Sequence, residues 1–310
     1  MRDAVKPDQT GQGIIIILLS VLLMAFADAL VKRVSADLTI WQLFFARSLF
    51  AIPVLLLFIR ASRARLTFQT PKWTLIRSLF LVLTWLAFYA SLPVLSLSVA
   101  AVAVYTNPII TTLLSAILIG EPVSKRQWGG VMLGFLGVIA ILRPGTDAFS
   151  WFTLLPLIAA VFYSLAMILT RSKCRDETPV MLAIALHGSF LITGLLATGV
   201  LFLLDLGADT SAQFPFLFGD WMPMGAEEWG LMLLLGVLSA AFFVGVARAY
   251  QIAPPSTIAT FDYAYLVSAA IWGFVFFAET PDILTMCGML LITAAGLLVS
   301  ISPSKKLDHT

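Results

Sequence analysis

The sequence predicts an all-α integral membrane protein whose ten transmembrane helices form two inverted five-helix repeats. The chain has 310 residues, of which 60 % are hydrophobic and only 12 % are charged, whereas about a quarter of the residues in soluble domains are charged. Apolar runs long enough to cross roughly 30 Å of hydrocarbon recur along the chain. One local pattern also occurs twice, and these features together predict the fold.

Ten apolar runs reach the length of a membrane span. The first run ends in small residues, as a signal peptide does, but a matching run opens the second half, so we expect a true helix there. Span four ends in a Glu-Pro turn, and span nine ends in a Glu-Thr-Pro turn. The expected spans are 14–34, 41–59, 73–91, 97–119, 126–143, 151–171, 179–204, 228–250, 256–278 and 283–301.

The repeated pattern is a pair of apolar helices around a glutamate-containing turn. When Glu121 is superposed on Glu279, Tyr105 falls on Tyr263 and Gly130 falls on Gly288 without a gap. Duplication of this kind predicts a repeat architecture. Each repeat has five spans, an odd number, so the second copy enters the membrane inverted. We expect the first repeat over 1–145 and the second over 146–310.

Lysine and arginine are distributed unevenly between the two ends of the expected spans. With the N-terminus inside, 15 of the 19 flank inner ends, including Arg77, and three lie in outer segments, including Lys32. Positive residues favour the cytoplasmic side. We therefore expect both termini in the cytoplasm, and a multi-pass protein of the bacterial inner membrane.

Four ionisable side chains lie within spans, where they usually have a partner or a wet cavity. Asp28 and Arg47 lie about 9 Å below the outer interface at 1.5 Å per residue, so we expect them to approach each other. They form either a structural ion pair or a contact to the charged end of a substrate. His187 takes the place of Arg47 in the second repeat, as a hydrogen-bonded structural residue or a proton relay. The fourth is Asp262.

Polar and aromatic residues meet where spans four and nine correspond. The segment VYTNP of span four matches FDYAY of span nine, and Pro108 frees a backbone carbonyl that needs a partner or water. We expect these segments to line a central cavity. The predicted substrate-binding residues are Tyr105, Asn107, Asp262, Tyr263, Tyr265, Trp85, Tyr89 and Tyr163. The predicted structural or gating residues are Asp28, Arg47, His187, Pro108, Glu121 and Glu279.

Other partners are not indicated. Two cysteines make no disulfide framework and have no metal-binding neighbours, so we expect neither a metal nor a cofactor. A net charge of +2 does not favour nucleic acid. Small residues of span five, such as Gly134, either form a dimer interface or pack on span ten; packing within one chain, and hence a monomer, is favoured.

The motifs resemble the drug/metabolite transporter superfamily with EamA-type repeats. The resemblance rests on LLSAILIGEPVSKRQWGGVMLGFLGV, on its echo FVFFAETPDILTMCGMLLITAAG, and on FFARSLF. It covers essentially the whole chain and implies a secondary carrier that works by alternating access. The layout is also similar to that of bacterial aromatic amino-acid exporters. Ala278 in place of Gly, the inserted Thr280 and His187 in place of Arg depart from the repeat pattern.

The predicted function is export of aromatic or hydrophobic amino acids, or of similar small metabolites. Asp262 would take the amino group. Phosphorylated substrates are not favoured, because they would need several buried cations. ATP binding is not predicted either, because no GxxxxGK[ST] motif is present. The alternatives are an exporter of another metabolite or drug, a channel, and an intramembrane lipid-modifying enzyme, which would need HExxH or a carboxylate pair. We expect that the protein is not an enzyme.

Overall fold

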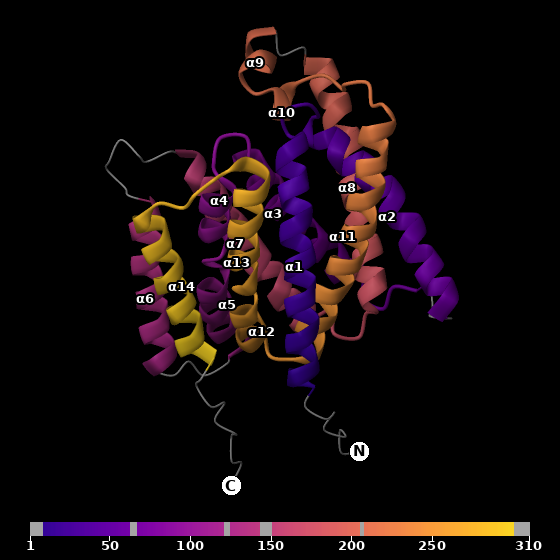
Figure 1. Cartoon of the computed structure of the whole chain (residues 1–310). Coiled ribbons are helices and arrows are strands. Elements are labelled where there is room, and N and C mark those ends of the chain that lie inside the picture. The colour runs from indigo at the N-terminus through magenta and orange to yellow at the C-terminus, as the bar shows by residue number, and fades with distance from the viewer. Residues whose placement is uncertain (1–8, 63–66, 121–124, 143–150, 205–207, 301–310) are drawn as a thin grey trace.

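The computed structural model describes residues 9–62, 67–120, 125–142, 151–204 and 208–300, and all regular elements in these ranges are helical (Figure 1). The first repeat contains α1 (Thr10–Val34), α2 (Ile40–Ser62), α3 (Pro71–Ser91), α4 (Leu97–Val104), α5 (Asn107–Leu114), the π-helical turn η1 (Ser115–Ile119) and α6 (Lys125–Leu142). The second contains α7 (Leu154–Ser172), α8 (Pro179–Leu204), α11 (Ala226–Ile252), α12 (Pro255–Phe261), α13 (Ala264–Phe277) and α14 (Ile283–Ser300). A 3-10 turn (Trp151–Thr153) precedes α7, and two short helices, α9 (Ala208–Gln213) and α10 (Pro215–Phe218), lie between α8 and α11.

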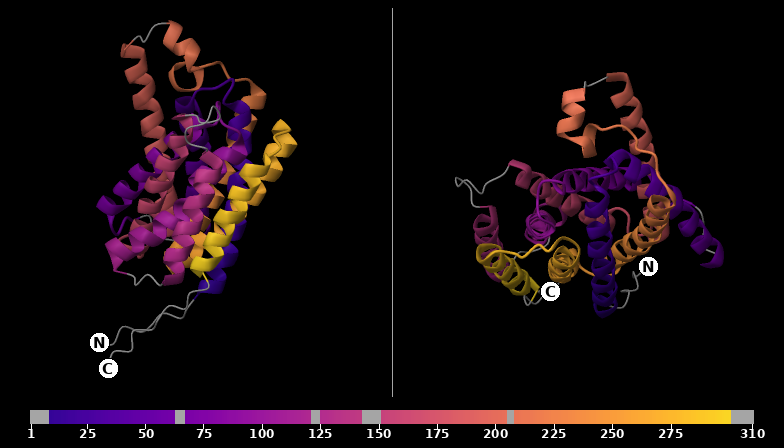
Figure 2. Two further views of the ribbon diagram at one scale, coloured as in Figure 1. Left: turned by 90° about the vertical axis from the view of Figure 1, so that its left-hand side faces the viewer. Right: turned by 45° about the horizontal axis from the view of Figure 1, so that its top comes forward.

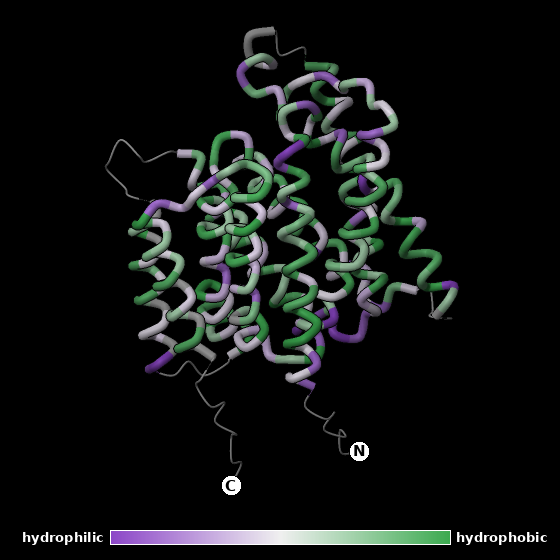
Figure 3. Tube along the Cα trace, viewed as in Figure 1, coloured by the Kyte–Doolittle hydropathy of each residue, from purple (hydrophilic) through white to green (hydrophobic). Residues whose placement is uncertain are grey.

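The predicted all-α membrane fold is confirmed. Eight helical stretches in the described ranges are long and apolar enough to cross a membrane, and α6 and α14 contain two shorter apolar helices. Hydrophobic residues run along the bundle, and many hydrophilic ones gather at its ends (Figure 3). The expected boundary between the repeats, at 145/146, lies outside the described residues.

Spans four and nine are each broken near mid-length. In span four the break falls at Tyr105 and Thr106, just before Pro108, whose ring cannot continue a regular helix. In span nine it falls at Asp262 and Tyr263. At each break the chain makes bonds of the i→i+3 type, from Ile109 N to Thr106 O (3.1 Å) and from Tyr265 N to Asp262 O (2.9 Å). The breaks place the polar side chains of Tyr105, Thr106, Asp262 and Tyr263 inside the bundle, where they are buried.

The packing follows an inverted repeat. In Figure 1, α4 and α5 descend while their counterparts α12 and α13 ascend. The equivalent pairs form accordingly: α4 contacts α13 and α5 contacts α12, while α3 packs on α7 and α1 packs on α11. Helices α6 and α14 pack on each other at the edge of the bundle (Figure 2). The start of α1 and the end of α14 lie at the same, lower end (Figure 1).

Two glycines bring helices of the second repeat against α2. A Cβ atom at Gly236 of α11 would lie 2.8 Å from Phe50 Cβ and 2.9 Å from Arg47 O. A Cβ atom at Gly194 of α8 would lie 2.6 Å from Trp41 O. These close backbone approaches hold α2, which carries Arg47, between α8 and α11.

Candidate substrate-binding site

Asp28 is fully buried and accepts two tyrosine hydroxyls. Tyr89 of α3 donates to Asp28 Oδ1 at 3.0 Å, and Tyr265 of α13 donates to Asp28 Oδ2 at 2.8 Å. Because Tyr265 comes from the second repeat, this carboxylate joins both repeats. Burial without such partners would cost several kcal/mol, so the hydroxyls are part of what keeps Asp28 in the bundle.

The matching depths of Asp28 and Arg47 predict that the two approach each other, and the structure links them through the hydroxyl of Tyr89 without a direct ion pair. Arg47 Nη1 donates to the hydroxyl of Tyr89 at 3.1 Å, and that hydroxyl donates to Asp28. The guanidinium lies over the ring of Phe190, 4.9 Å from its centroid. Its Nε and Nη2 have no hydrogen-bond partner in the described ranges. The two charges thus share one bridging tyrosine, and the aromatic faces supply further stabilisation of the cation.

A small central cavity lies beside this network. Its volume is about 20 Å³, room for about one water molecule. Five of the eight predicted substrate-binding residues line it, together with Asp28; the lining residues are Met24, Asp28, Thr84, Trp85, Phe88, Val104, Tyr105, Asn107, Tyr163 and Tyr265. The rings of Tyr105 and Tyr265 stack with centroids 4.6 Å apart. The expected lining is therefore brought together, around a space too small for a metabolite in this conformation.

Asp262 lies beside the cavity lining without forming part of it. Its Oδ2 accepts the hydroxyl of Tyr250 at 2.7 Å, while Oδ1 has no partner among the described residues. The next residue, Tyr263, was also predicted to bind substrate, and its ring contacts the ring of Tyr105, with the two centroids 6.4 Å apart. Tyr250, at the end of α11, was missed from the sequence, because an isolated tyrosine near a helix end carries no pattern that points to a buried carboxylate.

His187 is buried on α8, away from the central cavity. Its Nδ1 lies 3.2 Å from Ser48 Oγ of α2, and its ring contacts Phe190 and Phe243 edge-on. The contact joins the second span of one repeat to its counterpart in the other.

Glu279 and Lys32 form an ion pair at the upper end of the bundle, with Lys32 Nζ 3.1 Å from Glu279 Oε1. Lys32 also donates to Leu92 O (3.1 Å) and Leu95 O (2.5 Å), and Glu279 Oε2 accepts from Leu97 N (2.8 Å). The ion pair thus ties α1, the link between α3 and α4, and the end of α13 together. We call these contacts the Lys32–Glu279 clamp. The matching residue Glu121 lies outside the described residues.

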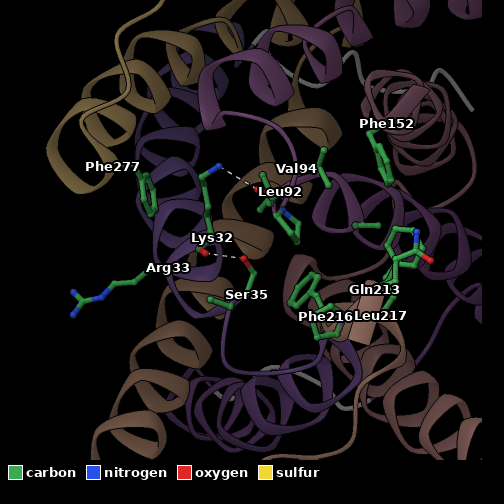
Figure 4. A pocket seen from close by; sticks show the side chains of 15 residues that line it. Lys32, Arg33, Ser35, Leu92, Val94, Phe152, Gln213, Phe216, Leu217 and Phe277 are labelled. Atoms are coloured by element: carbon green, nitrogen blue, oxygen red, sulfur yellow. Dashed lines mark hydrogen bonds between the residues drawn. The ribbon is translucent and has the colours of Figure 1, made fainter. Parts of the chain in front are cut away.

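A larger cavity of about 600 Å³ opens above the clamp. Figure 4 shows Lys32 pointing toward Leu92, with Phe152, Phe216 and Leu217 across the cavity and Arg33 turned away. Asp28 lines the small cavity and Lys32 lines this larger one, although they are one turn apart on α1. The clamp therefore lies between the two spaces.

Arg77 was counted among the charges that flank the inner ends of the spans, and this assignment was wrong. The helix α3 begins at Pro71, so Arg77 lies inside the span and is buried. Its Nε donates to Thr170 Oγ1 of α7 at 2.6 Å. Arg171, the residue after Thr170, donates from Nη1 to Gln251 O at 2.7 Å. This bond at the lower end corresponds to the bonds from Lys32 to the α3–α4 link at the upper end.

The buried polar groups near the central cavity include carboxylates, a guanidinium group and tyrosine hydroxyls. Within the described residues, no three His, Cys, Asp or Glu side chains are grouped closely enough to hold a metal ion. Chemically, the arrangement offers acidic and hydroxyl groups beside stacked aromatic rings, which suits a small molecule with a polar end and an apolar body.

Comparison with known proteins finds one family along the chain. The model of the EamA-like transporter family matches residues 11–143 and 150–301. The pseudopaline exporter CntI of Pseudomonas aeruginosa is 26 % identical over 301 residues, which cover 96 % of this chain and 99 % of that protein. The S-adenosylmethionine uptake transporter of Rickettsia felis is 24 % identical, covering 100 % of this chain and 98 % of that protein.

A solved crystal structure also has this fold. It has a TM-score of 0.67 at 17 % identity and covers 94 % of this chain and 98 % of the other. At this identity the likeness shows the fold alone.

Proposed function

The chain belongs to the EamA-like transporter family and is a multi-pass membrane transporter, and from this premise we propose that it exports a small amphipathic metabolite by alternating access. An amino acid with an aromatic or apolar side chain is the substrate that we favour. Another metabolite or a drug is the alternative, since the similar proteins include a pseudopaline exporter and an S-adenosylmethionine uptake transporter.

One observation carries the proposal: both repeats contribute to a polar, aromatic cavity at the centre of the bundle. Tyr105 and Asn107 come from span four, Tyr265 comes from span nine, and Tyr265 also binds Asp28 of α1. Inverted-repeat carriers place the substrate at the interface of the repeats. In our proposal the acidic groups take the polar end of the substrate and the rings take its apolar body.

The small volume of the cavity supports an occluded state for this conformation. A space of about 20 Å³ cannot hold a metabolite, so binding requires one end of the bundle to open. We propose that the Lys32–Glu279 clamp closes the upper end and that releasing it opens the larger cavity of about 600 Å³ to the centre.

We propose that the upper end faces away from the cytoplasm and that both termini are cytoplasmic, in a bacterial inner membrane. The lysine and arginine bias supports this orientation. Reporter fusions at each terminus test it: activity of a cytoplasm-dependent reporter at both ends is expected, and a periplasm-dependent reporter active at either end would refute it.

Purified protein in liposomes tests the function. The vesicles are given separate labelled pools of amino acids, nucleosides and sugars, and uptake is measured against empty vesicles. We expect saturable uptake of at least one amphipathic solute, lost on Tyr105→Ala. If no solute in any pool is taken up, the transport proposal fails. If only sugars or nucleosides are taken up, the amino-acid proposal fails and the alternative substrate stands.

A further inference from the structure

A single charged side chain lines the central cavity. Among the described residues of its lining, Asp28 is the only acid, and no lysine, arginine or histidine is present. Arg47 lies outside this lining and is linked to Asp28 only through the hydroxyl of Tyr89. The wall of the cavity therefore carries a carboxylate without a cationic side chain beside it, which favours a cation over an anion in the cavity.

Asp28 also has acceptor capacity left over. The two oxygens of a carboxylate offer about four lone-pair sites. In the described ranges, Oδ1 accepts one hydroxyl, from Tyr89, and Oδ2 accepts one, from Tyr265. About two acceptor sites thus remain on a side chain that is fully buried. Because a buried charge without a direct partner is costly, a ligand cation that donates to Asp28 would be bound by both charge and hydrogen bonds.

Asn107 adds a second acceptor to the same wall. It begins α5, directly after the break in span four, and it lines the cavity with 3 % of its surface exposed. Its Oδ1 has no hydrogen-bond partner within the described residues. Buried acceptors in folded proteins are nearly always paired, and an unpaired one is destabilising. The open amide oxygen therefore indicates a place for a donor that the chain itself does not supply.

The size of the cavity limits which group can lie between these two acceptors. A volume of about 20 Å³ has room for about one water molecule, so a group inside it lies close to both Asp28 and Asn107. An ammonium group is similar in size to a water molecule and has three donors. Trp85, Tyr105 and Tyr265 also line the cavity, and aromatic rings attract cations to their faces.

We propose that the central cavity binds the primary ammonium group of the substrate, with Asp28 supplying the charge and Asn107 Oδ1 accepting a second N–H. This inference rests on the proposed function and adds the substrate class, a primary amine or an amino acid held through its amino group. A quaternary ammonium keeps the charge but has no N–H to donate, and an alcohol or a carboxylate lacks the charge. The rest of the substrate enters when one end of the bundle opens.

The test measures binding of four probes that share a phenyl body. Phenethylamine is a primary amine, trimethyl(2-phenylethyl)ammonium keeps the charge without N–H groups, 2-phenylethanol is neutral, and 3-phenylpropionate is an anion. Titration calorimetry of the full chain in lipid nanodiscs gives a Kd for each probe with wild-type protein, Asp28→Asn and Asn107→Leu. Thr112→Val is the matched control, because Thr112 is buried on the same helix as Asn107, bonds to Pro108 O and does not line the cavity.

We expect wild-type protein to bind phenethylamine most tightly and 3-phenylpropionate most weakly. Asp28→Asn should weaken phenethylamine roughly 10- to 100-fold, the range for a hydrogen bond to a charged group, and should leave 2-phenylethanol unchanged. Asn107→Leu should weaken phenethylamine roughly 2- to 10-fold, the range for a neutral hydrogen bond, and should leave the trimethyl compound unchanged. Thr112→Val should change neither.

Equal binding of phenethylamine and 2-phenylethanol by wild-type protein would overturn the inference. Equal weakening of all four probes by Asp28→Asn would also overturn it, because that result indicates a structural role. If Asp28→Asn does not fold, Asn107→Leu decides, since it replaces a polar atom without a partner by a side chain of similar size. Equal loss of phenethylamine and of the trimethyl compound in Asn107→Leu would then refute the site.

Failure of the transport function has a different signature. In that case the probes would bind with the expected order of affinities, while proteoliposomes would exchange no solute. Transport of solutes without an amine, together with equal binding of the four probes, would overturn the ammonium site and leave the transport function intact.

Discussion

At the scale of single residues, tyrosine hydroxyls donate to the two buried aspartates, Asp28 and Asp262. Asp28 accepts from Tyr89 and Tyr265, and Asp262 accepts from Tyr250. A hydroxyl can donate to a carboxylate and also accept from an arginine, as Tyr89 does. In a carrier this arrangement is useful, because hydroxyl bonds are weaker than buried ion pairs and can be exchanged when helices move.

Tyr265 and Tyr263 offer a matched pair for testing this. The Tyr265 hydroxyl donates to Asp28, while that of Tyr263 is buried with no partner in the described ranges. Tyr265→Phe should destabilise the protein by about 1–2 kcal/mol, since a buried carboxylate oxygen loses its donor, and Tyr263→Phe should change stability little. Thermal unfolding in detergent measures both. Equal shifts would show that the Asp28 contact contributes no stability.

Sequence patterns placed Asp28 and Arg47 at one depth and gathered most of the cavity lining, because depth and helix face follow from residue spacing. They did not place Tyr89 between the charges, since bridging depends on side-chain geometry across three helices. Arg77 was misplaced for a simpler reason: it lies close to the start of the expected span 73–91 and was counted with the charges that flank that span. Only its packing against Thr170 of α7 shows it to be internal.

At the scale of helices, close backbone contacts fix the positions of α8 and α11 against α2. Gly236→Ala should destabilise the protein by about 1–3 kcal/mol, the usual range for overpacking, because its new methyl group would meet Phe50 Cβ and the backbone of Arg47. Gly230→Ala on the same helix has open space and should not destabilise. Thermal unfolding again measures the pair, and loss of stability in Gly230→Ala alone would contradict the packing described.

The Lys32–Glu279 clamp makes a prediction about opening. Ser98 of α4 is buried just inside the clamp, and Ser98→Cys should react slowly with a membrane-impermeant maleimide. Adding Glu279→Gln should speed the reaction several-fold, because the charge on which Lys32 and Leu97 N converge is lost. Glu228→Gln is the control, as Glu228 bonds to Gly225 N at the start of its own helix.

The native cysteines leave this measurement clear. Burial raises the pKa of the Cys174 thiol, which slows its reaction with maleimide, and exposed Cys287 is replaced by Ser. Labelling of Ser98→Cys that is equally slow with and without Glu279→Gln would mean that the clamp does not hold the upper end closed.

At the scale of the whole molecule, the inverted repeat gives two ends with related shapes and different chemistry. The span limits were predictable to within a few residues, as for Pro179–Leu204, because apolar length is read directly from the sequence. The short helices α9 and α10 were not, since they depend on local turns outside the apolar runs. The break in span nine has no proline at its centre, and no break was predicted there from the sequence.

Solute exchange across the membrane tests the central claim most directly, that this chain alternates access to a central site built by both repeats. Proteoliposomes loaded with unlabelled substrate should take up labelled substrate faster than empty ones, with saturation, and Asp262→Asn should abolish the acceleration while thermal unfolding confirms a folded protein. Uptake that rises linearly with concentration and is not accelerated by internal substrate, in wild-type protein, would contradict it.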